Sequence, residues 1–231
     1  MERTRHLWTL IAIACLILGA PTLLSAAISG PPTPGAPCTV SGNPPQLDPP
    51  GCDYHTYGPI IHGPGLPSAA ELRQGRHKDF VEGRKAPGGL YNGTISQFNS
   101  KMEFQLVGIN ENEGYTRTII LDVDCEAHAG PWNPDDSVIS FDTHMVRLEG
   151  SIGDNDPDFE SLRIIGGLDN GYESPGHQTA VRQEDGTYML DSMFEIGFRL
   201  EYVGAAGGPF EGYAGTSEGT ATVKAFAPDG Q

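Results

Sequence analysis

The sequence predicts an all-β fold: an antiparallel β-sandwich of jelly-roll or immunoglobulin-like type with at most one short helix, preceded by a signal peptide and a Pro-rich segment. Two observations carry this prediction. From residue 90 onward, apolar and polar residues alternate with the period of two that a half-buried strand requires. The pairs Asn92-Gly93, Asn170-Gly171 and Asp185-Gly186 separate these runs and supply residues that tolerate positive φ. We therefore expect a signal peptide over residues 1–27, a Pro/Gly-rich leader or linker over 28–67, and a single β-sandwich domain over 68–231.

The first 27 residues have the pattern of a secretory signal. Arg3 and Arg5 precede LWTLIAIACLILGA, an apolar run of 14 residues that is short for a membrane-spanning helix. Ser25 and Ala27 occupy the −3 and −1 positions of a small-residue cleavage site, so the mature chain is expected to start at Ile28. The sequence thus predicts a secreted, extracellular protein without a membrane anchor in the mature chain.

The expected mature chain is strongly acidic. The formal charge is −16, and loss of Glu2, Arg3 and Arg5 with the signal changes it to −17. Such a surface repels phosphate backbones and anionic lipids, which argues against nucleic-acid and membrane partners. The same charge favours solubility and attracts divalent cations.

Residues 28–67 contain 11 Pro and 7 Gly, so we expect an extended tether with no regular ladder, either disordered or an ordered strap. The aromatics of CDYHTYGPI, near its end, could dock on the domain that follows. Cys38 and Cys52 bracket part of this segment, and the sequence predicts a disulfide between them that is worth about 3 kcal/mol in the chain-entropy model. Cys125 then remains a reduced, buried thiol.

The domain itself is expected to begin with its one helix. The capping-box pattern Ser68-Ala69-Ala70-Glu71 predicts a short helix over about residues 69–75. Strands are predicted over Tyr188–Tyr202, which has the clearest alternation, and over Met102–Leu106, Val138–Leu148 and Thr220–Phe226. A two-residue turn at Asp185-Gly186 predicts that Val181 lies opposite Leu190 on the same face.

Two stretches carry a resemblance. VRLEGSIGD at residues 146–154, followed by DSMFEIGFRLEY at 191–202, resembles the C-terminal half of a loosely defined group of uncharacterised secreted β-rich proteins of environmental bacteria. Those proteins carry a strand of the type D-S-F-F-D-V-F-F-E-I. Asp191, Ser192 and Phe194 match it, Glu195 and Ile196 are mild changes, and Met193 and Gly197 replace aromatic positions. The resemblance covers about a third of the chain and implies an extracellular β domain, with no activity attached.

The stretch LDVDCEAH at residues 121–128 offers a candidate catalytic site. On a strand, Asp122, Asp124 and Glu126 share one face at a spacing of ~7 Å, with His128 beside them. A curved strand could bring two carboxylates to the roughly 5 to 5.5 Å that retaining glycosidases use. The order D-x-D-x-E superficially resembles the E-x-D-x-E strand of jelly-roll β-glucanases, but the first residue differs and the mature chain has a single Trp, Trp132. The alternative is a solvated acidic face of an outer strand.

A second acidic stretch, GDNDPDFE at residues 153–160, offers a candidate metal site. Asp154, Asp156 and Asp158 have the 1, 3, 5 spacing of a calcium loop. Phe159 and Ile165 stand where an EF-hand needs Gly and Glu, so the pattern predicts at most a looser calcium site, with an ordinary acidic turn as the alternative. The histidines show no zinc-ligand spacing, and no nucleophile elbow or nucleotide-binding motif is found.

The function that these patterns favour is a secreted, non-catalytic structural or adhesive module of unknown ligand, whose partner is an extracellular polymer, a glycan or a cell-surface protein. The competing hypothesis is a carbohydrate-active enzyme that uses Asp122, Asp124 and Glu126. A concave cleft over that face would favour the enzyme, whereas a flat, wet face would favour the module.

Overall fold

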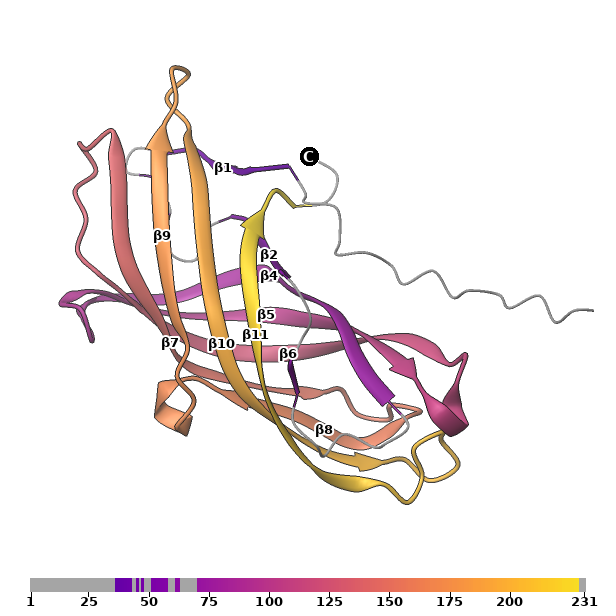
Figure 1. Cartoon of the computed structure of the whole chain (residues 1–231). Coiled ribbons are helices and arrows are strands. Elements are labelled where there is room, and N and C mark those ends of the chain that lie inside the picture. Colours follow the sequence, from indigo (N-terminus) through magenta and orange to yellow (C-terminus); the bar gives the residue numbers. More distant parts are fainter. Residues whose placement is uncertain are drawn as a thin grey trace, which may run out of the picture.

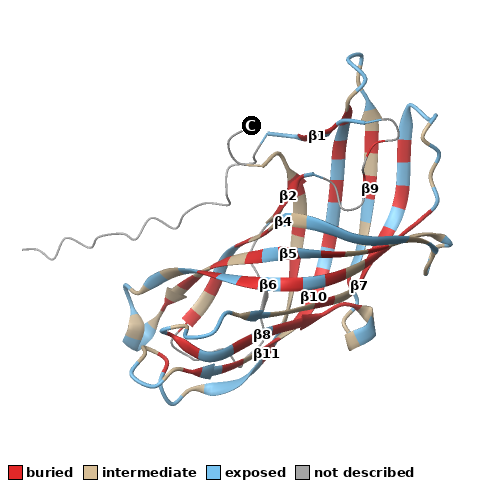
Figure 2. Ribbon diagram, turned by 180° about the vertical axis from the view of Figure 1, so that it is seen from behind, coloured by how far each residue is buried: buried red, intermediate tan, exposed pale blue. Residues whose placement is uncertain are grey.

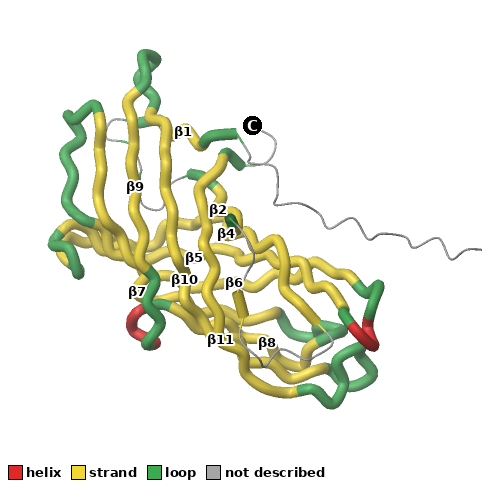
Figure 3. Tube along the Cα trace, in the orientation of Figure 1, coloured by secondary structure: helices red, strands yellow, loops and turns green. Residues whose placement is uncertain are grey.

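The computed structural model describes residues 36–42, 45, 47, 51–57, 61–62 and 70–228, so the predicted signal peptide lies outside the described residues. Within the described part, the only helical elements are two 3-10 turns, η1 (Asn110–Asn112) and η2 (Leu168–Asn170) (Figure 3). Everything else that is regular is strand, which confirms the predicted all-β antiparallel class. The strands are β1 (Cys38–Val40), β2 (Asp53–Thr56), β3 (Ile61–His62), β4 (Ala70–Gly88), β5 (Gly93–Gly108), β6 (Thr116–Ala129), β7 (Val138–Ile152), β8 (Phe159–Gly166), β9 (Pro175–Arg182), β10 (Tyr188–Gly204) and β11 (Ala214–Phe226).

The strands pair in a ladder that closes on itself. β4, β5, β6 and β7 form an antiparallel meander. The first half of β7 then pairs with β9 and its second half with β8, and both of these strands pair with β10. β10 pairs with β11, and β2 joins β11 back to β4. Every strand of this ring therefore has neighbours, and one face of the ring encloses the core.

Two layers pack against each other across that core. In Figure 1, β9, β10 and β11 run together in one layer, and β4, β5 and β6 cross behind them at a large angle, as in orthogonal sheet packing. Buried and exposed bands alternate along β7, β9 and β10 in Figure 2. The inward residues form one apolar cluster, in which Phe104, Leu121, Leu148, Phe198 and Leu200 are all at most 2% exposed.

The Pro-rich leader is part of the sheet, which corrects the expectation that it forms no ladder. β1 pairs with β10, β2 with β11 and β4, and β3 with β11. These short strands fit because CTV and DYHT contain no proline, so each residue can donate its N–H. The disulfide between Cys38 and Cys52 is confirmed, with Cα atoms 5.9 Å apart and both residues buried, and Cys125 is free and buried as predicted.

The helix predicted over residues 69–75 is wrong, because the strand β4 begins at Ala70. Ala70 and Leu72 are buried with Glu71 between them, and Leu72 lies opposite Leu106 of β5. The local capping pattern is thus overridden by cross-strand pairing and burial against β5.

The predicted register of the β9–β10 hairpin is also wrong by one residue. Val181 lies opposite Met189, and Leu190 lies opposite Ala180, so Val181 and Leu190 point to opposite faces. The loop has three residues rather than two: the N–H of Gln183 donates to the carbonyl oxygen of Thr187 at 2.7 Å, and Gly186 takes φ +84°. A three-residue loop with glycine in the left-handed position explains the shift.

Candidate functional site

The acidic face predicted on β6 forms, and its residues divide into two kinds. Leu121, Val123, Cys125 and Ala127 are buried, whereas Asp122 and Asp124 are exposed and Glu126 is half-buried. Across the ladder, Asp122 lies opposite Lys101 of β5, and Asp124 lies opposite Asn99. The outer face of β5 and β6 is therefore polar and carries charges of both signs.

Next to this face, β4 contains a β-bulge. Lys78 pairs with Lys101 and Val81 with Asn99, so Asp79 and Phe80 together oppose Ser100 alone. Asp79 adopts φ +55°, a left-handed conformation that is unfavourable for a residue with a side chain. The interrupted pairing sends Asp79 to the outside while the Phe80 ring packs against the core.

A groove lies along the outer face at this bulge. Its volume is about 280 Å³, and Val81, which is 65% exposed, forms part of its lining. The polar residues that line it are Asp79, Asn99, Ser100, Lys101, Asp122 and Asp124. The face over Asp122 and Asp124 is thus concave rather than flat, which by the criterion stated above favours the enzyme, but Glu126, the third residue of the predicted catalytic site, is not among the residues that line the groove.

Three carboxylates of the groove are available to a ligand. Within the described part of the chain, the side chains of Asp79, Asp122 and Asp124 make no hydrogen bond or salt bridge. All three are exposed, so they remain solvated when no ligand is present. The groove therefore presents a local excess of negative charge, and among the described residues that line it Lys101 is the only cationic one.

Glu126, by contrast, is held by its neighbours. Its carboxylate accepts a hydrogen bond from Gln97 Nε2 at 2.7 Å and contacts His128 Nε2 at 2.9 Å. The N–H of Leu90 donates to His128 Nδ1, so the neutral imidazole carries its hydrogen on Nε2 and donates it to Glu126. The hydrogen bond from Gln97 is the main cause that lowers the pKa of Glu126, and the contact with His128 adds to it.

This environment bears on the glycoside hydrolase hypothesis. A general acid for glycosidic cleavage needs a raised pKa, and that of Glu126 moves in the opposite direction. The hypothesis stays a prediction, and its test is hydrolysis of β-glucan, xylan or galactan that Glu126→Gln abolishes.

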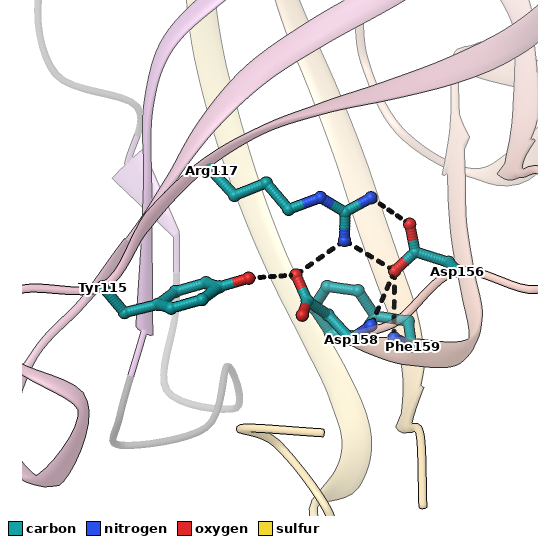
Figure 4. Close-up of polar contacts among 5 residues, drawn as sticks. All are labelled: Tyr115, Arg117, Asp156, Asp158 and Phe159. Atoms are coloured by element: carbon teal, nitrogen blue, oxygen red, sulfur yellow. Dashed lines mark hydrogen bonds and ion pairs between the residues drawn. The ribbon is translucent and has the colours of Figure 1, made fainter. Parts of the chain in front are cut away.

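The second acidic stretch contains an internal cation, the guanidinium of Arg117 on β6 (Figure 4). Its Nη1 lies 2.7 Å from Asp158 Oδ2 and 2.9 Å from Asp156 Oδ1, and its Nη2 also donates to Asp156. Tyr115 donates its hydroxyl to Asp158 at 2.7 Å. Asp156 further accepts the N–H groups of Asp158 and Phe159, which fixes the turn before β8.

The pKa values in this cluster follow from burial and hydrogen bonding. Burial opposes ionisation of Asp156, but the hydrogen bonds from Arg117 and two backbone N–H groups outweigh it and lower the pKa. Burial and the hydrogen bond to Asp158 raise the pKa of Tyr115 to about 12. The cluster is therefore a partly buried ion pair in which Asp156 is ionised at neutral pH.

The calcium site predicted from Asp154, Asp156 and Asp158 stays a prediction. The structure brings Asp156 and Asp158 together, whereas Asp154 is exposed and joins none of their contacts. Arg117 occupies the place that a cation would take between the two carboxylates. Over residues 70–228 and the described part of the leader, no group of three His, Cys, Asp or Glu side chains is placed to hold a metal ion.

Sequence reasoning missed a hydrogen-bonded chain on the exposed face of β7 and β9. Ser140 Oγ lies 3.0 Å from His177 Nε2, and His177 Nδ1 lies 2.8 Å from Asp142 Oδ1. These are the nitrogen assignments of a Ser-His-Asp triad. Ser140 and Asp142 are two apart on one strand, and only the β7–β9 pairing, which places Asp142 opposite His177, brings the histidine to them.

Cys125 lies beside a buried histidine. His77 Nε2 is 2.6 Å from Ser100 Oγ, and Ser100 Oγ is 3.7 Å from Cys125 Sγ. Burial raises the pKa of Cys125 to about 12 and lowers that of His77 to about 3, so both groups are neutral at physiological pH. This cluster is a packed core feature rather than a nucleophile and its base.

In the described ranges, no helix has the length and apolar character needed to cross a membrane. No protein-family model, curated protein or solved structure matches the chain.

Proposed function

We propose that this chain is a secreted binding module whose groove at the β4 bulge takes a cationic segment of an extracellular partner protein. The observation that carries the proposal is the groove itself, in which Asp79, Asp122 and Asp124 have no internal partner. The disulfide between Cys38 and Cys52 and the signal-like N-terminal sequence support an extracellular setting.

The lining of the groove favours a basic side chain over a sugar. Unpaired carboxylates attract an ammonium or guanidinium group, and exposed Val81 can pack against the aliphatic stem of a lysine or arginine. Sugars are bound mainly on aromatic platforms, and the described residues that line this groove include no aromatic ring. A basic peptide segment therefore fits its chemistry better than a neutral glycan.

Binding of a basic peptide tests the proposal. We expect hexa-arginine, but not hexa-glutamate, to bind the oxidised protein in isothermal titration calorimetry, with an affinity that falls as salt rises. Asp122→Asn/Asp124→Asn should raise the Kd at least fivefold, because two charge pairs of about 0.5–1 kcal/mol each sum to about 1–2 kcal/mol.

A matched control separates the groove from general attraction to an acidic protein. Glu160→Gln/Glu195→Gln removes the same charge from exposed positions on β8 and β10 and should change the Kd less than twofold. Equal weakening by the two double variants would contradict the proposal, as would equal binding of both peptides.

Ester hydrolysis is a second candidate function, favoured only by the geometry of Ser140, His177 and Asp142. In this reaction, Ser140 Oγ forms a bond to the acyl carbon while His177 Nε2 takes its proton. The alcohol leaves with that proton, Asp142 stabilises the imidazolium, and water then hydrolyses the acyl-serine. His177 and Asp142 are 52% and 69% exposed, and solvent weakens such a network.

A fluorophosphonate probe decides this question. If the triad is competent, the probe labels Ser140 far faster than exposed Ser161, and His177→Asn slows the labelling of Ser140 at least a hundredfold. Labelling of both serines at one rate, or labelling that is unaffected by His177→Asn, would exclude ester hydrolysis at this site.

A further inference from the structure

A second candidate site lies inside the closed sheet. A small cavity there is lined by residues from eight strands: β2, β4, β5, β6, β7, β9, β10 and β11. Its volume of about 20 Å³ has room for about one water molecule. Aromatic rings dominate the wall, contributed by Tyr54, His77, Phe80, Phe98 and Phe194.

One polar side chain in this wall has no partner. Gln178 of β9 is 1% exposed, and neither its Nε2 nor its Oε1 makes a hydrogen bond. An unpaired buried amide costs free energy comparable to its desolvation, about 1–3 kcal/mol. Such a group calls for an explanation, such as a bound guest or an ordered water, because an apolar residue of similar volume would be more stable.

The other polar groups of the cavity are already occupied. The Tyr54 hydroxyl is 2.8 Å from Ser192 Oγ, and His77 Nε2 is 2.6 Å from Ser100 Oγ. Among the described residues, no Asp, Glu, Lys or Arg lines the wall. A guest must therefore be uncharged, have a flat or apolar body that suits the rings, and present one edge with a hydrogen-bond donor beside an acceptor to match the amide of Gln178.

Phe80 is the part of the wall that a guest can displace. Every other lining residue is buried, whereas Phe80 is only partly buried. It sits on the β4 bulge, where the ladder to β5 is interrupted, and its ring contacts Tyr54, His77 and Phe98 edge-on or tilted. Movement of one ring outward opens a volume of about one aromatic ring without breaking a strand pairing.

We propose that this aromatic cavity binds a small neutral aromatic molecule that carries an amide-like edge, with Gln178 as the hydrogen-bonding residue and Phe80 as the movable wall. The site is separate from the acidic groove, and its success or failure is independent of the proposed peptide binding.

Benzamide and toluene are suitable probes, because they share a ring and differ in the amide. We expect benzamide to bind the oxidised wild-type protein at least tenfold more tightly than toluene in ligand-observed NMR titrations. Nuclear Overhauser effects should connect its ring protons to the Met145 methyl group, which lines the cavity. Phe80→Ala should tighten the binding of both probes several-fold, because it enlarges an apolar cavity.

The decisive variant is Gln178→Leu. It should remove the preference for benzamide while leaving toluene binding within twofold, and its thermal midpoint should be equal to or above that of wild type because an unpaired amide is gone. Met189→Ala, which trims an exposed apolar side chain on β10, should change neither affinity. Equal affinity of the two probes for wild type, a preference that survives Gln178→Leu, or no binding of either probe would overturn the proposal and leave the cavity as the site of an ordered water only.

Discussion

Replacement of Arg117 by Met should be among the most destabilising changes on the outside of the sheet. The variant keeps the length and packing of the side chain but leaves Asp156 and Asp158, whose side chains are 5% and 3% exposed, without their cation. Removing one partner of a buried ion pair costs about 3–5 kcal/mol. Because Arg117 itself is 29% exposed and water can partly replace it, we expect about 3 kcal/mol at pH 7.

The pH dependence of this loss tests its cause. The pKa of Asp156 is lowered in the folded protein, so its contribution is fully present above its ordinary value of 3.8 and is lost as the pH falls through the folded-state value. In Arg117→Met the same carboxylate is buried without a cation and is relieved by protonation. The difference in unfolding free energy between the two proteins should therefore be largest near pH 7 and shrink below about pH 4.

Urea denaturation followed by circular dichroism measures these free energies. Arg163→Met is the control, because Arg163 is 55% exposed and its Nη1 lies 3.7 Å from Glu201, so its loss should cost less than about 0.5 kcal/mol. The triple variant Arg117→Met/Asp156→Asn/Asp158→Asn should recover part of the stability, since no charge is then buried. A cost for Arg117→Met no larger than that of Arg163→Met, or a cost that does not change with pH, would refute the reasoning.

Three other predictions follow from the same contacts. Glu126→Gln should lower the unfolding free energy by about 1 kcal/mol at pH 7, because it weakens the hydrogen bonds with Gln97 and His128, whereas Asp124→Asn, which loses no bond, should stay within about 0.5 kcal/mol. The pKa of Glu126 is lowered from 4.5 in the folded protein, so the ionised carboxylate stabilises the fold fully above that value. The destabilisation caused by Glu126→Gln should therefore diminish as the pH falls below 4.5 and through the folded-state pKa, as measured in urea titrations at pH 7, 5 and 3. Iodoacetamide should modify Cys125 only in denaturant, and non-reducing peptide mapping should recover the Cys38–Cys52 pair; modification of the native protein would contradict the burial of this thiol. Millimolar calcium, compared with magnesium, should raise the thermal midpoint of Arg117→Met more than that of wild type, because in wild type the guanidinium competes with the ion for Asp156 and Asp158. An equal rise in Arg117→Met/Asp156→Ala would exclude an ion shared by these carboxylates.

The strands that the sequence predicts well are those that carry no extra residue of their own along the alternating stretch. In β10 every second residue is buried from Tyr188 to Phe194, and in β6 every second residue is buried from Leu121 to Ala127. The apolar residues of these stretches therefore mark the inner face directly. Such a strand can be predicted without knowing which strand pairs with it, because the alternation of apolar and polar residues depends only on which face is buried.

β4 could not be predicted in this way, because its bulges shift the phase. The buried positions at its start are Ala70, Leu72, Gly75 and His77, so the spacing changes from two to three where Gln74 is inserted. Spacings of both two and three residues between buried positions resemble the periodicity of a helix, and the capping pattern at Ser68 favours the same interpretation. Bulges have no reliable sequence signal here, because Gln74 and Asp79 rather than glycines take the positive φ.

The candidate sites depend on these unpredicted features. The acidic residues of β6 could be placed on one face from their spacing, but the groove beside them exists because the bulge at Asp79 and Phe80 interrupts the pairing with Ser100. The partner of Asp156 and Asp158 could not be found from spacing, since Arg117 is about 40 residues away and arrives through the fold.

One bulge contributes a residue to each of the two proposed sites. At this bulge Asp79 points into the acidic groove and the next residue, Phe80, closes the aromatic cavity on the opposite side of the sheet. Ser100, the single residue opposite them, lines the groove and also contacts His77, which lines the cavity. A regular ladder would have placed successive side chains on fixed faces with no gap between strands. Asp79 adopts a left-handed conformation with φ +55°, and this residue lines the groove. The bulge is therefore the feature of β4 on which both proposed sites depend.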